Sequence, residues 1–314
     1  MKEKKLMITK YIFEIILIIF LSFIYYLSQP IKTQKVIFIP KGSINQIISQ
    51  LQQEHYDVCK LDAYLLRFIG NPQSGWINMG SNLQTRADFL YRLTKAKAAL
   101  RTITLIPGET TYIFLNQLAN NLGLDRKKLE LSFEKYAPIQ EGVFVPNTYK
   151  IPVGITEDAL MKLLVNTSLR NMKALSVKIF GSYNQEKWFH YISIASIIQK
   201  ESANTKEMPI VSSVIYNRLK KGIKLQMDGS LNYGKYSHQK VTAQRIRSDK
   251  SQFNTYIHKG VPLIPVCNVS KEAIRAAIFP KHTNYLYFMK SKKGTHDFAC
   301  NYSTHLRNIK RATK

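Results

Sequence analysis

Cysteine is scarce in this chain, and its spacing excludes the common zinc sites. Three cysteines, Cys59, Cys267 and Cys300, occur among 314 residues, and no two of them form a CxxC pair. We therefore predict no metal site, and no motif in the sequence calls for another cofactor. Cys267 and Cys300 could form a disulfide in an oxidising compartment, but free, half-buried thiols are the interpretation that we favour.

Acidic residues are also few. The chain has 20 Asp and Glu against 46 Lys and Arg, and its formal net charge of +26 favours an anionic partner. The basic residues are spread along the whole chain, however, and no zinc finger, basic zipper or RNA-binding signature accompanies them. We predict no nucleic-acid partner, since an acidic membrane surface or an anionic cell-wall polymer fits the charge equally well.

Low-complexity tracts and heptad repeats are absent from the sequence. Hydrophobic residues make up 45% of the chain and charged residues 21%, a composition that excludes a disordered protein. With 314 residues, the chain is long enough for two modest domains with cores of their own.

An apolar run follows a lysine-rich start. Four lysines within residues 1–10 precede a segment at 11–28 in which Glu14 is the only charged residue. The segment approaches the ~20 residues needed to cross a bilayer. We predict a signal anchor with residues 1–10 in the cytoplasm and the rest of the chain outside, because flanking lysines stay on the cytoplasmic side. A cleaved signal peptide is the rival interpretation, but no small-x-small pattern follows the run.

Residues 35–105 have the pattern of a small α/β module. The spacing of apolar residues predicts a strand at 36–39, helices at 44–51, 61–68 and 85–93, and a strand at 101–106. The sequence Pro40-Lys41-Gly42-Ser43 introduces the first of these helices.

The remaining residues, 106–314, predict a mixed domain. Helices are expected at 156–175, 186–202 and 271–278, followed by a hairpin that pairs 285–289 with 296–300. We therefore assign the chain to the α+β class, with one N-terminal transmembrane helix, a small α/β module and a larger α+β domain.

Glu201 ends the apolar stripe of the helix predicted at 186–202. Ile197 and Ile198 lie four and three residues before it and share its face of the helix. Apolar neighbours and the negative end of the helix dipole both raise the pKa of a carboxyl group, which suits a general acid. Lys200 points about 100° away and need not neutralise it. The alternative is a partly buried glutamate that a nearby cation neutralises.

A polar loop follows Glu201 in the sequence. A second helix carries Arg218, and the loop at 225–234 then places hydrogen-bonding side chains, one carboxylate and a tyrosine around two glycines. Loops of this composition are typical of sugar-binding clefts. We expect Arg218 to form an ion pair with Asp228 that holds the loop.

The order of these segments, IASIIQKES followed by VSSVIYNRLKKGIKLQMDGSLNYG, resembles the YceG-like family of endolytic murein transglycosylases. The family pattern runs ASI-x-x-KE-[TS], then V-[FY]-x-NRL-x-x-G-M-x-L-Q-x-D-[PG]-[TS], then YG. Further segments are similar to family motifs: 106–110, 141–149, 253–256, 285–288 and 294–298. Gly229 stands where proline is common, and Asn147 where aspartate is usual. The resemblance covers roughly residues 100–310 well.

The resemblance implies a membrane-anchored lytic transglycosylase. Such an enzyme cleaves the β-1,4 bond between N-acetylmuramic acid and N-acetylglucosamine of nascent peptidoglycan and leaves a 1,6-anhydro end. The resemblance also implies that 35–105 is a LysM-like module and that 106–314 is the catalytic domain. It places the chain in the inner membrane, facing the periplasm, with peptidoglycan synthases as expected neighbours. Glu201 matches the catalytic glutamate, which acts as general acid and then as base.

Eight further residues are candidates for binding or shaping a glycan site, because amides, phenols and carboxylates hydrogen-bond to sugars: Gln226, Asp228, Asn217, Tyr233, Asn254, Tyr256, Glu141 and Tyr149. Asp228 is the second candidate carboxylate and Glu141 the third, so muramidase-type hydrolysis by a carboxylate pair stays open. A catalytically silent, membrane-tethered glycan-binding scaffold is the other alternative. We interpret His296 as a structural histidine.

Overall fold

The computed structural model of the protein describes residues 2–313. The first residue of the predicted tail and the last residue of the predicted catalytic domain lie outside them. The chain divides into two units, residues 1–101 with 150–156, and residues 102–149 with 157–314. The division falls within the two-stranded sheet of β5 (Leu100–Leu105) and β6 (Asn147–Pro152).

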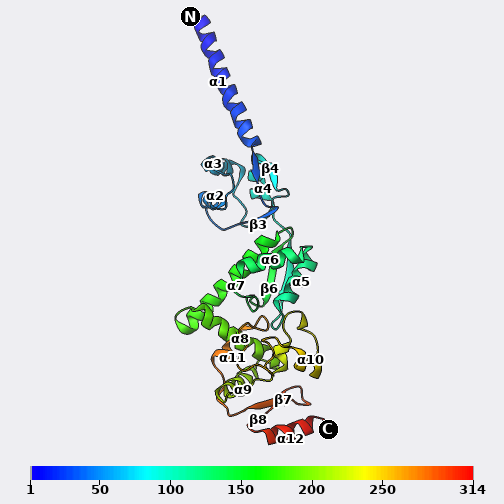
Figure 1. Ribbon diagram of the computed structural model, residues 1–314. Helices are drawn as coiled ribbons and strands as arrows, with labels where there is room; N and C mark the ends of the chain where they lie inside the picture. Colours follow the sequence, from blue (N-terminus) through cyan, green and yellow to red (C-terminus); the bar gives the residue numbers. More distant parts are fainter. Residues whose placement is uncertain (1, 314) are drawn as a thin grey trace. The chain divides into compact units, whose positions relative to one another are not determined.

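Helix α1 (Lys2–Ser28) contains the predicted membrane span (Figure 1). Its apolar part, Leu6–Ser28, has 23 residues, and none of its most apolar window is buried. It is the one helix among residues 2–313 that is long and apolar enough to cross a bilayer. This geometry is compatible with a single-pass membrane anchor.

The globular part of the first unit combines two small sheets with three helices. Its elements are β1 (Pro30–Lys32), β2 (Val36–Ile39), α2 (Ile44–Gln53), α3 (Lys60–Ile69), β3 (Gly75–Asn78), β4 (Leu83–Thr85) and α4 (Arg86–Lys95). β2 pairs with β3 in antiparallel register, with Ile37 opposite Ile77, and β1 pairs with β4 in the same sense. The predicted strand at 36–39 and the three helices are confirmed. β3 and β4 were not predicted, because strands of three or four residues are too short to show a clear alternation of apolar and polar residues.

Apolar side chains from both sheets and all three helices form the core of this unit. Its buried members include Ile31, Ile37, Ile39, Ile47, Ile48, Leu51, Leu66, Ile77, Phe89, Leu90 and Leu93. The start of α2 is set by a capping box, in which the Ser43 side chain accepts from the Gln46 N–H and the Gln46 side chain accepts from the Ser43 N–H. Arg86 on α4 and Asp62 on α3 form a buried ion pair at 2.6 Å.

The second unit is mainly helical. Its elements are α5 (Thr111–Leu122), α6 (Arg126–Tyr136), α7 (Glu157–Phe180), α8 (Gln185–Glu201), α9 (Met208–Lys220), the 3-10 helices η1 (Asp228–Leu231) and η2 (Gly234–Tyr236), α10 (Ala243–Ser248), α11 (Lys271–Ile278), β7 (Tyr287–Lys290), β8 (His296–Ala299) and α12 (Tyr302–Thr313). The predicted helices and the C-terminal hairpin are confirmed, the latter with Phe288 opposite Phe298.

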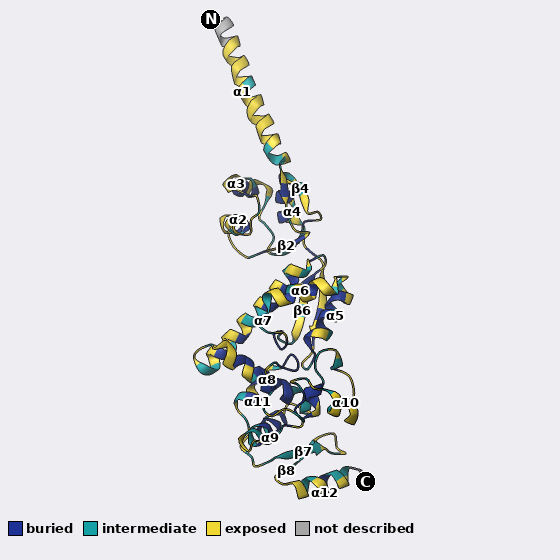
Figure 2. Cartoon of the chain, in the orientation of Figure 1, coloured by how far each residue is buried: buried dark blue, intermediate teal, exposed yellow. Residues whose placement is uncertain are grey.

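Helix α8 lies at the centre of the second unit, in contact with α9, α11 and η1 (Figure 2). We predicted an apolar stripe on this helix, but Ser193 and Ser196 are buried as well. Ser196 Oγ accepts from the Val266 N–H at 2.8 Å and donates to the Ser193 carbonyl at 2.7 Å. Because the hydroxyl is satisfied in this way, the helix can be enclosed beyond its apolar stripe. Glu201 is its last residue.

The three cysteines are free. Cys267 and Cys300 are thus unpaired, as predicted, but Cys267 is buried and Cys300 exposed, so neither has the half-buried environment that we expected; Cys59 is exposed.

Candidate active site

Glu201 meets the loop that follows α9. Its Oε1 accepts a hydrogen bond from the Gly229 N–H at 2.6 Å. Burial raises the pKa of Glu201 to about 7; the bond from Gly229 opposes this shift, and the negative charge of Asp228 adds to it. Lys200 donates to Ser237 Oγ at 2.9 Å, in keeping with the prediction that it points away from Glu201.

A pocket of about 310 Å³ opens in front of Glu201. It is lined by Glu201, Arg218, Leu225, Gln226, Met227, Asp228, Tyr256, Phe288, Met289, Lys290 and His296. Three of the predicted binding residues, Gln226, Asp228 and Tyr256, are thus brought together with Glu201. The pocket is formed by the end of α8, the loop at 224–228, the loop after α10 and the C-terminal hairpin.

Asp228 is held by a phenol. The Tyr256 hydroxyl donates to Asp228 Oδ1 at 2.6 Å. Burial and this carboxylate raise the pKa of Tyr256, so the phenol stays protonated. The bond orients the Asp228 carboxylate in the pocket without neutralising its charge.

The predicted ion pair between Arg218 and Asp228 is wrong. Arg218 donates instead to the carbonyls of Leu286, at 2.6 Å, and Leu225, at 2.9 Å. These carbonyls lie in segments without regular hydrogen bonding, and a guanidinium group with five N–H donors can satisfy several of them at once. Arg218 therefore ties the loop after α9 to the start of the C-terminal hairpin, next to Gln226, whose backbone has a positive φ of 51°.

Asn217 and Asn254 lie outside the Glu201 pocket. The Asn217 side-chain amide donates to the carbonyls of Thr283 and Tyr285, at 2.8 and 2.9 Å. Asn254 is fully buried and donates to the Asp249 carbonyl at 2.7 Å. Both amides are engaged by the backbone, so they hold loops in place around the pocket.

Glu141 and Tyr233 line a second pocket of about 370 Å³ in the same unit. Glu141 is buried and accepts from the N–H and hydroxyl of Thr111, at 2.9 and 2.7 Å, and from the Gly142 N–H at 2.8 Å. Burial raises the pKa of Glu141 to about 7 although these hydrogen bonds oppose the shift. Tyr149 borders neither pocket, and its hydroxyl donates to the Val145 carbonyl.

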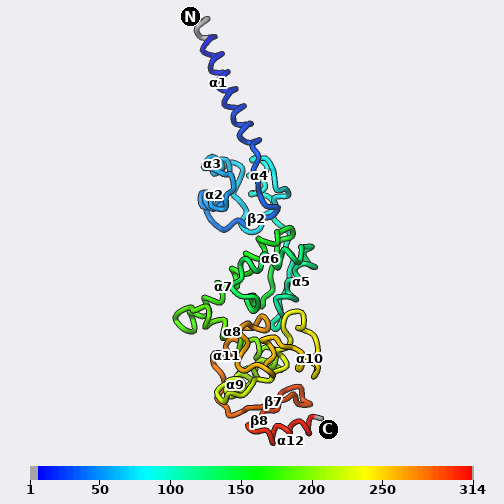
Figure 3. Tube along the Cα trace, in the orientation of Figure 1, coloured from blue at the N-terminus to red at the C-terminus, as the bar shows by residue number. Residues whose placement is uncertain are grey.

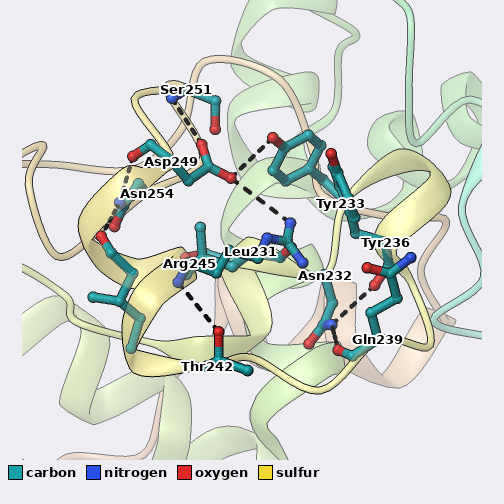
Figure 4. A network of polar contacts seen from close by, with 12 residues as sticks. Leu231, Asn232, Tyr233, Tyr236, Gln239, Thr242, Arg245, Asp249, Ser251 and Asn254 are labelled. Carbon is teal, nitrogen blue, oxygen red and sulfur yellow. Dashed lines mark hydrogen bonds and ion pairs between the residues drawn. The ribbon is translucent and has the colours of Figure 1, made fainter.

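An aromatic and cationic network fixes the segment between the two pockets (Figure 4). Tyr233 stacks on Phe253 with ring centres 4.3 Å apart and donates from its hydroxyl to Asp249 Oδ2 at 3.0 Å. The Arg245 guanidinium lies 3.8 Å from the centre of the Tyr236 ring and forms an ion pair with Asp249. The loop that carries Asp228 and Gly229 thus continues into a segment, 233–236, that these contacts hold in place.

His296, which we interpreted as a structural histidine, also lines the Glu201 pocket. Its Nδ1 lies 2.8 Å from Glu207 Oε2, and its backbone N–H donates to Glu207 Oε1 at 2.9 Å. Burial opposes the shift, but these hydrogen bonds hold the pKa of Glu207 below its ordinary value. The carboxylate can only accept, so Nδ1 carries the proton. The sequence did contain a signal for a role of His296 in the site, because residues 294–298 form one of the segments that resemble motifs of the YceG-like family.

The residues that the structure describes contain no cluster of three or more His, Cys, Asp or Glu side chains that could hold a metal ion.

Comparisons with known proteins agree on one family. The YceG-like family matches residues 37–311 of this chain. An endolytic murein transglycosylase of Bacillus subtilis is 25% identical over 294 residues, which cover 84% of this chain and 80% of that protein. A protein of the same name from Streptococcus pneumoniae strain R6 is 29% identical over 175 residues, 54% of this chain and 31% of that protein.

One solved structure shares the fold. A 2.6 Å crystal structure of a YceG-like protein from Listeria monocytogenes superposes with a TM-score of 0.56 and 20% identity. The superposition covers 88% of this chain and 99% of that one.

Proposed function

This chain belongs to the YceG-like family, and from that premise we propose that it is an endolytic lytic transglycosylase of peptidoglycan. The proposed reaction cleaves the β-1,4 bond between N-acetylmuramic acid and N-acetylglucosamine of nascent glycan strands and leaves a 1,6-anhydro-muramic acid end. The observation that carries the proposal is Glu201, a carboxyl group with a pKa of about 7 in a pocket rich in hydrogen-bonding groups. The names of the similar proteins support the same reaction.

Glu201 acts first as an acid and then as a base. The protonated carboxyl donates its proton to the glycosidic oxygen while the bond from that oxygen to C1 of muramic acid breaks. The carboxylate then takes the proton of the C6 hydroxyl as the C6 oxygen bonds to C1. Glu201 ends protonated, as it began, and no water is consumed. A pKa of about 7 makes both forms accessible at neutral pH.

Asp228 has a supporting role in this scheme. Positive charge develops at C1 as the glycosidic bond breaks, and a carboxylate already oriented by Tyr256 stabilises it without further reorganisation. The same charge helps to keep the pKa of Glu201 high.

The remaining predicted residues divide into two groups. We propose that Gln226, Asp228 and Tyr256 contact the sugars in the Glu201 pocket, and that Glu141 and Tyr233 contact the strand in the second pocket. Asn217, Asn254 and Tyr149 shape the site through the backbone carbonyls to which they donate.

We add His296 to the groups that contact the glycan. Because Nδ1 is engaged by Glu207, Nε2 is the ring nitrogen that remains for a ligand. His296 lines the same pocket as Glu201, so Nε2 can form a hydrogen bond with a sugar hydroxyl. Glu207 is then a positioning residue that orients the ring.

Two alternatives retain the same fold. A muramidase-type hydrolase would use Glu201 with Asp228, and the presence of both carboxylates in one pocket is the observation that favours it. A silent glycan-binding scaffold would use the same pocket without cleaving the strand.

We also propose where the reaction takes place. The lysines before the apolar helix favour a cytoplasmic N-terminus, which would put the Glu201 pocket on the periplasmic side of the inner membrane, close to peptidoglycan synthases. In this arrangement residues 35–105 form a LysM-like module and 106–314 the catalytic domain.

The test is the chemistry of the products. The full chain, in detergent, is incubated with peptide-stripped, uncrosslinked glycan strands, and the products are identified by mass spectrometry. We expect anhydro-muramic ends from the wild type and a loss of at least about 100-fold in rate for Glu201→Gln, the typical contribution of a general acid. Glu186→Gln, on the exposed first turn of α8, is the matched control and should retain full activity.

Other products would select an alternative. Reducing muramic ends would identify a hydrolase and make Asp228 its second carboxylate. If neither protein cleaved the strands while both bound them, the scaffold would be the correct interpretation.

A further inference from the structure

The last turn of α1 is fastened to the first turn of α3. The Tyr26 hydroxyl donates to Asp62 Oδ1 at 2.9 Å and lies 3.1 Å from Cys59 Sγ. Arg86 donates to Asp62 Oδ2 at 2.6 Å, and its guanidinium carbon lies 4.5 Å from the centre of the Tyr26 ring. Asp62 is fully buried and Arg86 nearly so, and Arg86 also forms an ion pair with Asp57 at 3.1 Å. These contacts hold the two helices in one arrangement.

This junction lies at the depth where the apolar helix ends. At 1.5 Å per residue, the 23 residues of Leu6–Ser28 extend over roughly 35 Å, slightly more than the ~30 Å hydrocarbon core of a bilayer. Tyr26 stands in the last turn, and tyrosine is enriched at the membrane–water interface. In a chain whose α1 crosses a bilayer, the N-terminal end of α3, bonded to Tyr26, would lie at the level of the lipid headgroups.

α3 presents an apolar stripe on the side away from its own core. Ala63 and Leu66 are buried, whereas Leu61, Tyr64 and Phe68 are 45%, 57% and 89% exposed. Spacings of three and four residues place these three side chains on one face of the helix. Phe68 is the most exposed of the three, and together they form one contiguous apolar stripe, the kind of surface that marks an interaction site.

The charges of α3 show what kind of surface covers the stripe. Lys60 and Arg67 are exposed on the same helix, and the Arg67 guanidinium lies 5.1 Å from the centre of the Tyr64 ring. The one acidic residue of the helix, Asp62, is buried. An apolar face bordered by basic residues is typical of helices that lie in the headgroup region of an anionic membrane.

We propose that the stripe of Leu61, Tyr64 and Phe68 contacts the headgroup region of the bilayer that α1 crosses, with Lys60 and Arg67 at the phosphates of anionic lipids. Continuity with α1 selects lipid as the occupant, because the hydrogen bond from Tyr26 to Asp62 joins the first turn of α3 to the last turn of the apolar helix. The contact holds the first unit in one orientation on the membrane surface. This inference rests on the proposed membrane anchor and is independent of the chemistry at Glu201.

The test measures the depth of α3 in the full chain. The protein, with Cys59→Ser and Cys300→Ser to remove the exposed thiols, is reconstituted in liposomes of phosphatidylcholine and phosphatidylglycerol. A single cysteine, introduced as Phe68→Cys or as Leu61→Cys, carries an environment-sensitive fluorophore, and the quencher is a nitroxide on the upper part of the lipid chain. Leu61→Cys keeps Phe68 in place. Phe38→Cys is the matched control, since Phe38 is an exposed aromatic residue on β2, which Figure 3 places away from α1 in the same unit.

We expect the lipid nitroxide to quench the labels at 61 and 68 several-fold more strongly than the label at 38. Aqueous iodide should quench in the reverse order, and omission of phosphatidylglycerol should weaken the lipid effect. Equal quenching at the three positions would overturn the proposal. A label at 68 that glycan strands shield from iodide, but lipid does not quench, would also overturn it and assign the stripe to glycan.

Flotation of the liposomes at alkaline pH tests the anchor separately. A chain that floats with the lipid but whose α3 labels are not quenched contradicts the surface contact and leaves the anchor intact. A chain that does not float contradicts both. Cleavage of strands by the same preparation reports on the proposed reaction independently of either result.

Discussion

At the scale of single residues, the proposed chemistry depends on a balance around one carboxyl group. Burial and the charge of Asp228 favour the protonated form of Glu201, and the Gly229 N–H favours the ionised form. Together they leave a group with a pKa of about 7, which can give and take a proton at neutral pH. The balance is local, so small changes around Glu201 should appear in the pH dependence of the rate.

Gly229→Ala tests the bond to Glu201. A Cβ at this position would lie 2.6 Å from the Lys200 Cβ and 2.9 Å from Glu201 Oε1, so the loop must shift and the bond must lengthen. Because the bond lowers the pKa of Glu201, we expect the alkaline limb of kcat/KM to move to higher pH and the rate to fall. Gly42→Ala, another glycine without a positive φ but outside the pocket, should leave the profile unchanged. An unaltered profile for Gly229→Ala would contradict the role of the bond.

His296→Gln tests the proposed glycan contact. Loss of one neutral hydrogen bond of ~1 kcal/mol should lower kcat/KM about fivefold to tenfold, mainly through KM. Glu207→Gln should lower it less, because the ring remains but loses the carboxylate that orients it. His190→Gln, an exposed histidine on α8, is the control. If His296→Gln bound and cleaved strands like the wild type, the histidine would be structural, as the sequence interpretation had it.

At the scale of secondary-structure elements, the pocket is the place where α8, the loop after α9 and the C-terminal hairpin meet. Arg218 joins the last two through backbone carbonyls, and Asn217 on the preceding position reinforces the link. The loop after α9 is thus held by two neighbouring residues at the C-terminal end of α9.

Arg218→Lys tests this link. A lysine ammonium cannot reproduce the fork of guanidinium N–H groups, so buried carbonyls lose their partners. We expect the free energy of unfolding, measured by urea denaturation, to fall by about 2 kcal/mol and KM to rise as Gln226 loses its support. Arg247→Lys, at an exposed arginine of α10, should change neither quantity. Unchanged stability for Arg218→Lys would show that water can replace the guanidinium.

At the scale of the whole molecule, two buried carboxyl groups couple the stability of the second unit to pH. Glu201 and Glu141 both have a pKa of about 7 in the folded state, above the ordinary value of 4.5. The unfolded state releases these protons first, so the free energy of unfolding falls as the pH rises from about 4.5 to about 7. Stability at neutral pH is therefore lower than the apolar core alone would provide.

Glu141→Gln should remove one of these two contributions without touching the proposed catalytic group. Thermal and urea unfolding of wild type and variant between pH 5 and 8 is the measurement. We expect the wild type to lose up to about 3 kcal/mol more than the variant over this range. Parallel pH profiles of the two proteins would mean that Glu141 is not buried in its neutral form.

The amino-acid sequence by itself determined the parts of this protein that depend on local pattern. The apolar helix at the N-terminus, the strand at 36–39 and the helix that ends at Glu201 follow from the spacing of apolar residues over a few turns. The raised pKa of Glu201 also follows from local pattern, because the helix positions that surround it are apolar.

Tertiary structure alone decided which polar groups share the pocket. Glu207 and His296 lie far apart in the chain and meet only through the C-terminal hairpin. Arg218 donates to backbone carbonyls that only the folded loop brings within reach, and not to Asp228, the partner that we predicted. The physical reason is that a buried polar group forms hydrogen bonds with whichever partner the packing of distant segments places near it. No periodic pattern in the sequence predicts which segments will meet in this way.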